Sequence, residues 1–381
     1  MPGAPEFRAV SNEDFRAADQ ADVRAADKAA FRPTWAEIDT SAFSRNIDAI
    51  TQRLPDRSRL IAVLKANAYG HGATVLAGVC ESKRVAMIAV AMLEEALTLR
   101  RIGITVPTLV FGPLDARGIA VAVDNDITVG VTGPEELAAA CEVTRDREVH
   151  VHLKLDTGMG RMGIVESELQ LALEMIRATP QLKIDAIYTH FATADEDESF
   201  ARAQIANFDR MRTVIDAPLH HMANSAATLR GLAREGDYVR CGVALFGPGK
   251  SAPTEPVMRW RSEIMRLKTL PPDHAIGYGA TFRTKRDSRI ATIPVGYADG
   301  YSRRLSNNGE VVIRGQRAPI VGLVSMDLVT IDVTDIAGAR LGDECVLLGD
   351  GITADDIASR IDTISYVVLC SVSARVPRIF R

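Results

Sequence analysis

Short apolar runs alternate with helix-like stretches along much of the chain, from Trp35 to about Gly249. The runs are rich in Val and Ile, and in stretches such as ESELQLALEMIRA the apolar residues recur every three or four positions. This alternation predicts parallel βα units whose strands are covered on both faces. So many units favour a closed (β/α)8 barrel of the TIM type over an open sheet. The runs include LIAVL (60–64), VAMIAVA (85–91), PTLVFG (107–112), ITVGVT (127–132), VHVHLKLD (149–156), KIDAIYTH (183–190) and PLHHMAN (218–224).

The pattern changes after about Glu255. From there the chain offers short strand-like segments such as RIATIPVGYA and ECVLLGD, broken by Gly, Asn and Asp, which are typical of an all-β module. TADDIASRI adds a helical pattern to that module. We therefore expect a flexible N-terminal extension over residues 1–33, an α/β barrel over 34–250 and a C-terminal β domain over 251–381.

Composition narrows the possible partners. The 381 residues carry a formal net charge of −4, which gives no reason to expect nucleic acid or an anionic membrane as a partner. No apolar run is long enough to span a bilayer. The five cysteines are scattered and form no C-x-x-C pair, which argues against a disulfide framework or a zinc site and fits the reducing cytoplasm. Residues 1–33 repeat an F/V-R-A-A-D pattern, and their acidic residues argue against a mitochondrial transit peptide.

Lys65 follows directly on the apolar run LIAVL, where a charge is usually avoided. In a βα barrel the reactive groups project from the C-terminal ends of the strands, and Lys65 is expected at such an end. A partly desolvated amine there can act as a base, or as a nucleophile that forms a Schiff base. The alternative is a lysine whose stem covers apolar surface while its ammonium group reaches water.

Other predicted strand ends also carry polar side chains. Asn224 and Ser225 open a helix, whose N-terminus can bind an anion, and Gly242 lets the backbone approach a ligand closely. Each residue alone has an ordinary interpretation as an ion pair, a core histidine or a helix cap. Together with Lys65 they suit pyridoxal 5′-phosphate (PLP), an aldehyde that carries a phosphate. The polar side chains at the other strand ends are Lys154, Asp156, Arg161, His190, His221 and Arg240.

Eight longer motifs occur in one order along the chain, and together they are very specific. They are VLKANAYGHG, KLDTGMGRMG, YTHFATADE, HMANSAA, VRCGVALFG, GYGATF, PVGYADGY and VSMD. In these motifs the chain resembles the alanine racemase family, PLP enzymes with an α/β barrel and a C-terminal β domain. The resemblance runs from WAEIDTSAFSRNI (35–47) to VPRIF (376–380).

The resemblance implies a role for each matching residue. Lys65 would bind PLP covalently and serve as one acid/base group, and Tyr278 would be the opposing base, supplied to the barrel of a partner subunit. Arg161 and the backbone N–H of Met326 would bind the substrate carboxylate, and Lys154 matches a position that is often carbamylated. The residues implied to hold the rest of the cofactor are Tyr69, Ser225, Gly242, Val243 and Tyr366 at the phosphate, and Arg240 with His190 behind it at the pyridine nitrogen.

The resemblance also implies the reaction and the assembly. The expected enzyme is a cytoplasmic homodimer that interconverts L- and D-alanine, either to supply D-alanine for peptidoglycan or to degrade it. Two bases on opposite faces of the cofactor would let a proton leave one side and return on the other.

Four departures from the family pattern keep alternatives open. Leu323, Leu328, Phe246 and Val367 stand where the family usually has polar residues. A racemase of serine or of larger amino acids, and an inactive paralogue with a regulatory role, therefore remain as alternatives. A non-catalytic PLP carrier is a third, which would explain Lys65 and the phosphate pocket but not the β domain with Tyr278. A decarboxylase is disfavoured because Arg240, rather than an acid, is expected at the pyridine nitrogen. A metal hydrolase has little support, since His150 and His152 alternate along a strand instead of sharing a helix face.

Overall fold

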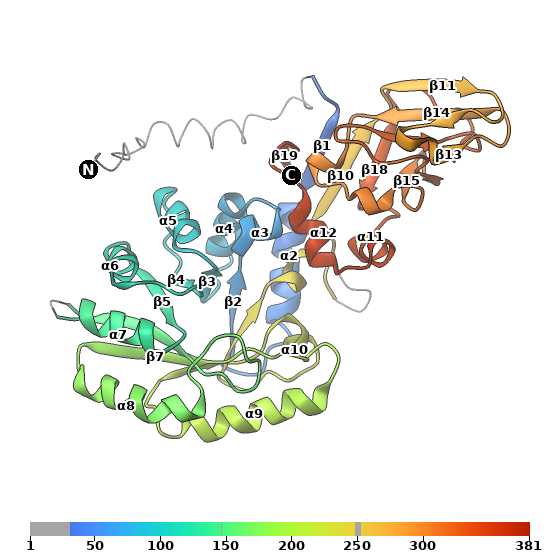
Figure 1. Ribbon diagram of the computed structural model, residues 1–381. Coiled ribbons are helices and arrows are strands. Elements are labelled where there is room, and N and C mark those ends of the chain that lie inside the picture. Colours follow the sequence, from blue (N-terminus) through green and yellow to red (C-terminus); the bar gives the residue numbers. More distant parts are fainter. Residues whose placement is uncertain (1–30, 146, 248–252) are drawn as a thin grey trace, which may run out of the picture. The chain divides into compact units, whose positions relative to one another are not determined.

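The computed structural model describes residues 31–145, 147–247 and 253–381, which form two compact units (Figure 1). One unit is Thr40–Val257, and the other joins the chain up to Asp39 with Met258–Arg381. Most of the expected N-terminal extension, and the boundary expected at residues 250 and 251, lie outside the described residues. The N-terminal boundary of the barrel unit lies at residues 39 and 40, six residues beyond the expected one.

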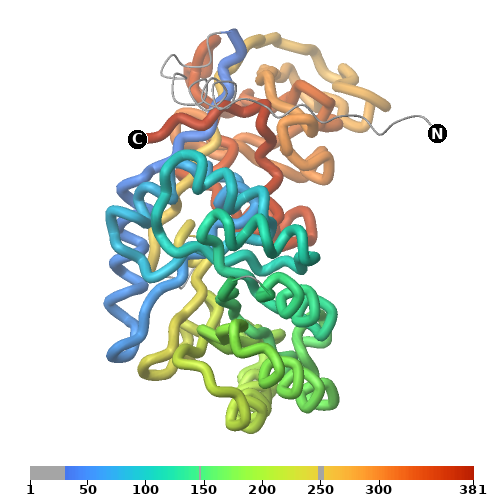
Figure 2. Tube along the Cα trace, turned by 90° about the vertical axis from the view of Figure 1, so that its left-hand side faces the viewer, coloured from blue at the N-terminus to red at the C-terminus, as the bar shows by residue number. Residues whose placement is uncertain are grey.

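Eight parallel strands form the sheet of the first unit, in the order β8-β7-β6-β5-β4-β3-β2-β9. β2 and β9 lie side by side, as blue and yellow segments in Figures 1 and 2. At the seam, the Arg240 N–H in β9 donates to the Ala223 carbonyl just beyond β8, at 2.8 Å, so the barrel is nearly closed. The predicted barrel is confirmed. Its strands are β2 (Arg59–Val63), β3 (Met87–Val90), β4 (Thr108–Val110), β5 (Ile127–Val131), β6 (Val149–Lys154), β7 (Leu182–Tyr188), β8 (Leu219–His221) and β9 (Tyr238–Cys241).

Helices follow the barrel strands and cover their outer faces. In α8 (Leu169–Ala178) the apolar residues at three- and four-residue spacing are the buried ones, as the sequence pattern predicts. The Asp197 side chain accepts from two backbone N–H groups and so fixes where α9 (Glu198–Arg212) begins. The other helices are α2 (Thr40–Thr51), α4 (Ala73–Ser82), α5 (Leu93–Arg101), α6 (Ala116–Asp124), α7 (Pro134–Val143) and α10 (Ser225–Leu229), with short 3₁₀ turns η1 (Glu166–Glu168) and η2 (Val243–Phe246). The segment α3 (Lys65–Tyr69) is a left-handed turn.

Strands dominate the second unit, which confirms the predicted strand-rich C-terminal part. A six-stranded sheet in the order β16-β15-β18-β10-β1-β19 stands beside a three-stranded sheet β11-β14-β17 and a hairpin β12-β13. Two helices, α11 (Ala354–Ile361) and α12 (Ser365–Ser371), complete this unit. The strands are β1 (Thr34–Ile38), β10 (Met258–Glu263), β11 (Arg266–Leu270), β12 (Ala275–Ile276), β13 (Phe282–Arg283), β14 (Ser288–Ile293), β15 (Glu310–Ile313), β16 (Gln316–Pro319), β17 (Val329–Asp332), β18 (Glu344–Leu348) and β19 (Arg378–Phe380), with 3₁₀ turns η3 (Tyr278–Ala280), η4 (Tyr297–Asp299) and η5 (Arg303–Leu305).

The first strand, β1, belongs to the strand-rich unit, although residues from 34 onward were expected in the barrel. It pairs antiparallel with β10 and parallel with β19, both far away in the sequence. Its five residues are all buried. A short buried strand has the same apolar sequence pattern in either sheet, so the sequence does not show which sheet it joins.

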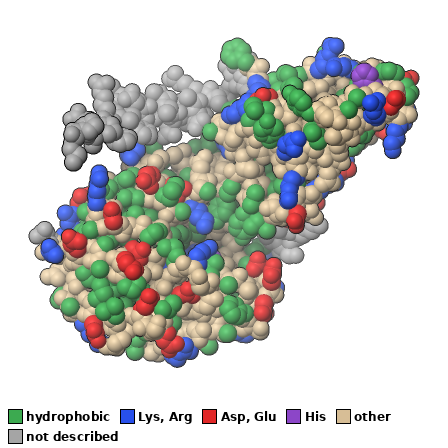
Figure 3. All heavy atoms as spheres, viewed as in Figure 1, with side chains coloured by type: hydrophobic (Ala, Val, Ile, Leu, Met, Phe, Trp, Pro, Cys, Tyr) green, Lys and Arg blue, Asp and Glu red, His purple; other side chains and the backbone are tan. Residues whose placement is uncertain are grey.

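On the face shown in Figure 3, acidic and basic side chains are interspersed over the barrel unit. Among the described residues, none of the helices has the length and apolar character that crossing a membrane requires.

Candidate active site

Lys65 stands just beyond the C-terminal end of β2, two residues after Val63, and is exposed. The next four residues, Ala66 to Tyr69, all have φ near +53°, and Gly70 follows at +81°. Such a left-handed turn costs roughly 1–2 kcal/mol per non-glycine residue, so surrounding contacts must hold it. Glu95 accepts from the Ala66 N–H at 2.7 Å, and the Asn67 side chain accepts from the Ala73 N–H at 2.8 Å. These bonds turn the chain sharply directly after the lysine.

Arg240 projects from β9 and is 4% exposed. One terminal nitrogen donates to the Nδ1 and carbonyl oxygen of His221, at 2.9 and 2.6 Å. The other donates to His190 Nδ1 at 3.1 Å and to the carbonyl oxygens of Thr189 and Met222. All of these acceptors are neutral. Burial lowers the pKa of Arg240 to about 10, so the guanidinium stays charged at neutral pH.

The arginine sets the tautomers of the histidines around it. Because Arg240 donates to His221 Nδ1, the proton of that ring is on Nε2, which donates to His152 Nδ1 at 2.9 Å. The His190 proton is likewise on Nε2. Burial, with Arg240 adding repulsion, lowers the pKa of His190 to about 3. Burial also lowers the pKa of His152 to about 4 and that of His221 well below its usual value. All three rings are therefore neutral.

Lys154, at the end of β6, is 7% exposed. Burial lowers its pKa to about 8, and the positive charges of Arg161, Arg240 and Lys65 add to the shift. The Asp156 carboxylate opposes it, and the same side chain accepts from three successive N–H groups, of residues 158 to 160, in the glycine-rich loop that leads to Arg161. Four positive charges lower the pKa of His190, those of Lys65, Lys154, Arg161 and Arg240. One region of the barrel therefore holds four cations.

Hydrogen-bond donors gather beside this cationic region. The Ser225 hydroxyl, at the start of α10, accepts from the N–H groups of Gly242 and Ala244 at 3.0 and 3.3 Å. A Cβ at position 242 would lie 2.2 Å from the Tyr69 hydroxyl, so this contact requires glycine. The Asn224 amide caps α10 by accepting from the Ala227 N–H at 2.9 Å, and Val243 opens η2. Tyr69, Ser225 and the backbone at Gly242 thus meet as predicted.

Phe246 has an apolar environment that suits its departure from the family pattern. Its ring centroid lies 5.0 Å from that of Tyr69, 4.4 Å from that of His71 and 5.5 Å from that of Phe43. The phenyl ring is 2% exposed and supports Tyr69 by packing alone.

Three predicted site residues lie in the strand-rich unit, where Tyr278 was expected. Tyr278 is 74% exposed in η3, Met326 is 53% exposed between β16 and β17, and Tyr366 is 39% exposed in α12. All three side chains are therefore accessible on the surface of this unit.

Two buried residues were not predicted as part of the site. His152 contacts His221, and the Tyr188 ring stacks on His221 with centroids 4.7 Å apart while Arg240 lies over the same ring at 5.5 Å. Strand alternation offered one signal, because His152 is two residues before Lys154 and so shares its face of β6. The contacts themselves join strands far apart in the sequence.

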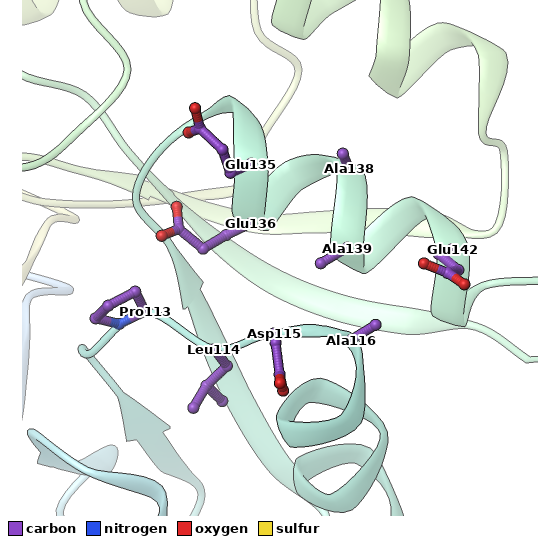
Figure 4. A pocket seen from close by; sticks show the side chains of 9 residues that line it. All are labelled: Pro113, Leu114, Asp115, Ala116, Glu135, Glu136, Ala138, Ala139 and Glu142. Atoms are coloured by element: carbon purple, nitrogen blue, oxygen red, sulfur yellow. The ribbon is translucent and has the colours of Figure 1, made fainter.

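A separate cavity of about 530 Å³ opens between α6 and α7 (Figure 4). Four carboxylates line it, which disfavours a phosphate, whereas the cationic region with its hydroxyls and N–H groups fits one. The cationic region also places an amine, Lys65, at a strand end, so the residues present fit PLP. Within the described residues, no group of three or more His, Cys, Asp or Glu side chains could hold a metal ion. The cavity is lined by Pro113, Leu114, Asp115, Ala116, Glu135, Glu136, Ala138, Ala139 and Glu142.

Comparison with known families covers nearly the whole described chain. Residues 38–249 match the family model "Alanine racemase, N-terminal domain", and residues 257–380 match "Alanine racemase, C-terminal domain". A curated alanine racemase of Sorangium cellulosum is 43% identical over 376 residues, covering 92% of this chain and 99% of the relative. One from Halothermothrix orenii is 39% identical over 373 residues, covering 92% and 97%.

Solved structures give the same result. The chain is similar to the alanine racemase from Bacillus anthracis with bound L-Ala-P, with a TM-score of 0.86 and 37% identity, covering 92% of this chain and 95% of that one. It is also similar to the alanine racemase from E. faecalis, with a TM-score of 0.86 and 35% identity, covering 92% and 98%.

Proposed function

The chain belongs to the alanine racemase family, and from this premise we propose that it interconverts L- and D-alanine with PLP and two opposing bases. The observation that carries the proposal is the meeting of Lys65, Lys154, Arg161 and Arg240 in one region of the barrel, beside the Tyr69, Ser225 and Gly242 cluster. That arrangement offers an amine, a set of anion-binding groups and a permanent cation.

Each part of the cofactor has residues suited to hold it. Lys65 would bind PLP covalently through its amine, while Tyr69, Ser225 and the backbone around Gly242 and Val243 would bind the phosphate. Asn224 would hold the backbone of this phosphate site through its cap on α10. Tyr366 would add a phenol from the strand-rich unit. When bound, PLP withdraws electrons from the α-carbon of the amino acid and so acidifies its hydrogen.

Arg240 would donate to the pyridine nitrogen without surrendering its proton. Its pKa of about 10 keeps the guanidinium charged at neutral pH, and its bonds to His190 and His221 fix its orientation. An unprotonated ring attracts electrons more weakly. We infer that Arg240 limits the electron withdrawal and thereby favours racemisation over transamination.

Lys65 and Tyr278 would move the proton. Lys65 would remove or return it on one face of the α-carbon and Tyr278 on the other, so that the configuration inverts. Arg161 and the Met326 N–H would hold the carboxylate, which fixes the α-hydrogen between the two bases.

Lys154 is suited to carbamylation. A pKa of about 8 leaves part of the amine neutral near pH 7, and only the neutral amine adds CO₂. The resulting carbamate would replace one of four neighbouring cations by an anion that pairs with Arg161. Intact-protein mass spectrometry with and without bicarbonate should show one added CO₂ in the native chain. The same spectra of a Lys154→Gln variant should lack it.

We propose a cytoplasmic homodimer with shared sites, supplying D-alanine for peptidoglycan or degrading it. The exposed Tyr278, Met326 and Tyr366 support a partner subunit. The five free cysteines fit a reducing compartment.

The proposed function is tested with purified protein supplied with PLP and L-alanine. A chiral assay should detect D-alanine, and Lys65→Ala should abolish both its formation and the absorbance of protein-bound cofactor. A parallel assay with serine tests whether Leu323, Leu328 and Val367 shift the substrate range. Cofactor-loaded protein that forms no D-alanine would overturn the proposal.

A further inference from the structure

Tyr278 stands in a short loop whose backbone is left-handed at three positions. Gly277, Gly279 and Ala280 have φ values of 72°, 68° and 48°. Within the loop, the Ala280 N–H donates to the Gly277 carbonyl at 3.3 Å, near the long limit for such a bond. The Tyr278 side chain is 74% exposed. A strained and exposed loop keeps one geometry only if neighbouring segments hold it.

Asn307 lies in the turn between η5 and β15 and joins the Tyr278 loop to the segment around Gly322. Its Nδ2 donates to Thr281 Oγ1 at 3.1 Å, and its Oδ1 accepts from the Gly322 N–H at 2.6 Å. The backbone N–H requires an acceptor, so the amide oxygen faces Gly322 and the NH₂ group faces Thr281. Asn307 has φ 55°, a conformation that asparagine adopts more readily than most residues.

Gly322, the second partner of Asn307, lies in the segment that leads to Met326. Ser306 Oγ accepts from the Val324 N–H at 2.9 Å, next to the bond between Asn307 and Gly322. The two loops also touch directly, since a Cβ at Gly277 would lie 3.5 Å from the Leu323 nitrogen. Asn307 therefore links the Tyr278 loop to the Met326 segment inside one unit.

We propose that Asn307 is a positioning residue for racemisation, which fixes Tyr278 relative to the backbone of Met326. This inference rests on the proposed function, in which Tyr278 acts at the α-carbon and the Met326 N–H binds the carboxylate. In alanine the carboxylate group is bonded directly to the α-carbon. The two protein groups therefore need a fixed separation, and Asn307 supplies the tie between their loops.

Asn308 is a matched control in the same turn. Its side chain donates to the Arg360 carbonyl at 2.8 Å, and Arg360 donates back to its carbonyl at 2.6 Å. It thus contacts α11, while Asn307 contacts the two loops. Both asparagines are exposed, so replacing either by alanine should leave the overall fold intact, although Asn307→Ala adds local strain at its positive φ.

The test compares holoenzymes of Asn307→Ala, Thr281→Val, Asn308→Ala and wild type, each given L- or D-alanine in heavy water. NMR measures α-hydrogen exchange with retention, and a chiral assay measures inversion. Asn307→Ala should lower racemisation about tenfold. For the enantiomer that Lys65 deprotonates, α-hydrogen exchange with retention of configuration should continue. The ratio of the rate of this exchange to the rate of inversion should therefore rise by about the same factor. Thr281→Val should move this ratio in the same direction, the double variant should add little, and Asn308→Ala should stay within about twofold of wild type.

Two results separate the inference from the proposed function. Suppose that the wild type is active but the ratio of exchange to inversion is unchanged in Asn307→Ala, or changes no more than in Asn308→Ala. That result overturns the positioning role of Asn307 and leaves the proposed function standing. If Asn307→Ala fails to fold by circular dichroism, Thr281→Val decides, because it removes the same hydrogen bond. A wild type that does not racemise alanine overturns the proposed function and this inference together.

Discussion

Arg240 shows how one buried side chain determines the chemistry of several others. Its guanidinium donates to His190 and His221, and His221 in turn donates to His152. The strand-end position of Arg240 could be predicted from the sequence. The histidine chain could not, because its members sit on strands 19 to 69 residues apart in the sequence and meet only when the barrel closes.

The low pKa of His152 makes stability depend on pH. Its pKa is about 4 in the folded protein and 6.5 when unperturbed, so between these values the unfolded chain binds the extra proton. Stability should therefore fall as pH drops from about 6.5 towards 4, by up to about 1.4 kcal/mol per pH unit for this histidine. Urea unfolding at about pH 7 and about pH 5 checks this, and His152→Gln should reduce the dependence, of which the other buried histidines retain a part.

His150→Gln is the matched control for that experiment. His150 is on the same strand but exposed, where it pairs with Asp185 at 2.9 Å. It should leave the pH dependence close to that of wild type. A His152→Gln variant that keeps the full wild-type dependence would contradict the assignment of the burial effect to His152.

At the scale of elements, the turn after Lys65 departs most from what the sequence predicts. Gly70 and Gly72 indicate a turn there, and both have positive φ. Four consecutive non-glycine residues in the left-handed region could not be predicted, because alanine and tyrosine disfavour that conformation and asparagine adopts it only as a single residue. Glu95, which accepts from the Ala66 N–H, reaches the turn only in the folded barrel, whereas the bond that Asn67 accepts from the Ala73 N–H is local.

Substitutions at Ala66 test whether this turn positions Lys65. A β-branched residue fits the left-handed region poorly, so Ala66→Val should lower the free energy of unfolding by about 1–2 kcal/mol and reduce racemisation by about tenfold. Ala66→Gly should be neutral or stabilising by up to about 1 kcal/mol. Thermal unfolding and the chiral assay measure both effects.

Ala138→Val in α7 is the comparison, because Ala138 is exposed in an ordinary helix. It should cost only about 0.5 kcal/mol and leave activity unchanged. If Ala66→Val behaved like Ala138→Val in both assays, the turn would have no role in positioning the lysine.

At the scale of the whole molecule, the proposed site draws on both units. The alternation of strands and helices predicts the barrel, and the short Gly-broken segments predict the strand-rich unit. The boundary between the two units in the sequence was harder to predict, because β1 precedes the barrel strands but pairs with β10 and β19. Short buried strands carry no local mark of their partner.

Subunit complementation tests the sharing of sites. Lys65→Ala and Tyr278→Phe homodimers should each be almost inactive. Random mixing by co-expression would make half the dimers mixed, each with one intact site, so activity should return to about a quarter of the wild-type value. Sedimentation should show dimers in every preparation. Activity that stays at the level of the separate variants would argue that each chain completes its own site.

The central claim is that Lys65 and Tyr278 act on opposite faces of one α-carbon, and proton exchange measures this most directly. L- and D-alanine are incubated separately in heavy water with wild type and with Tyr278→Phe, and α-deuterium and configuration are followed together. Wild type should invert both enantiomers. In Tyr278→Phe inversion should nearly vanish, while one enantiomer alone continues to exchange its α-hydrogen with retention through Lys65. Equal and small losses of exchange from both enantiomers would contradict the two-base account.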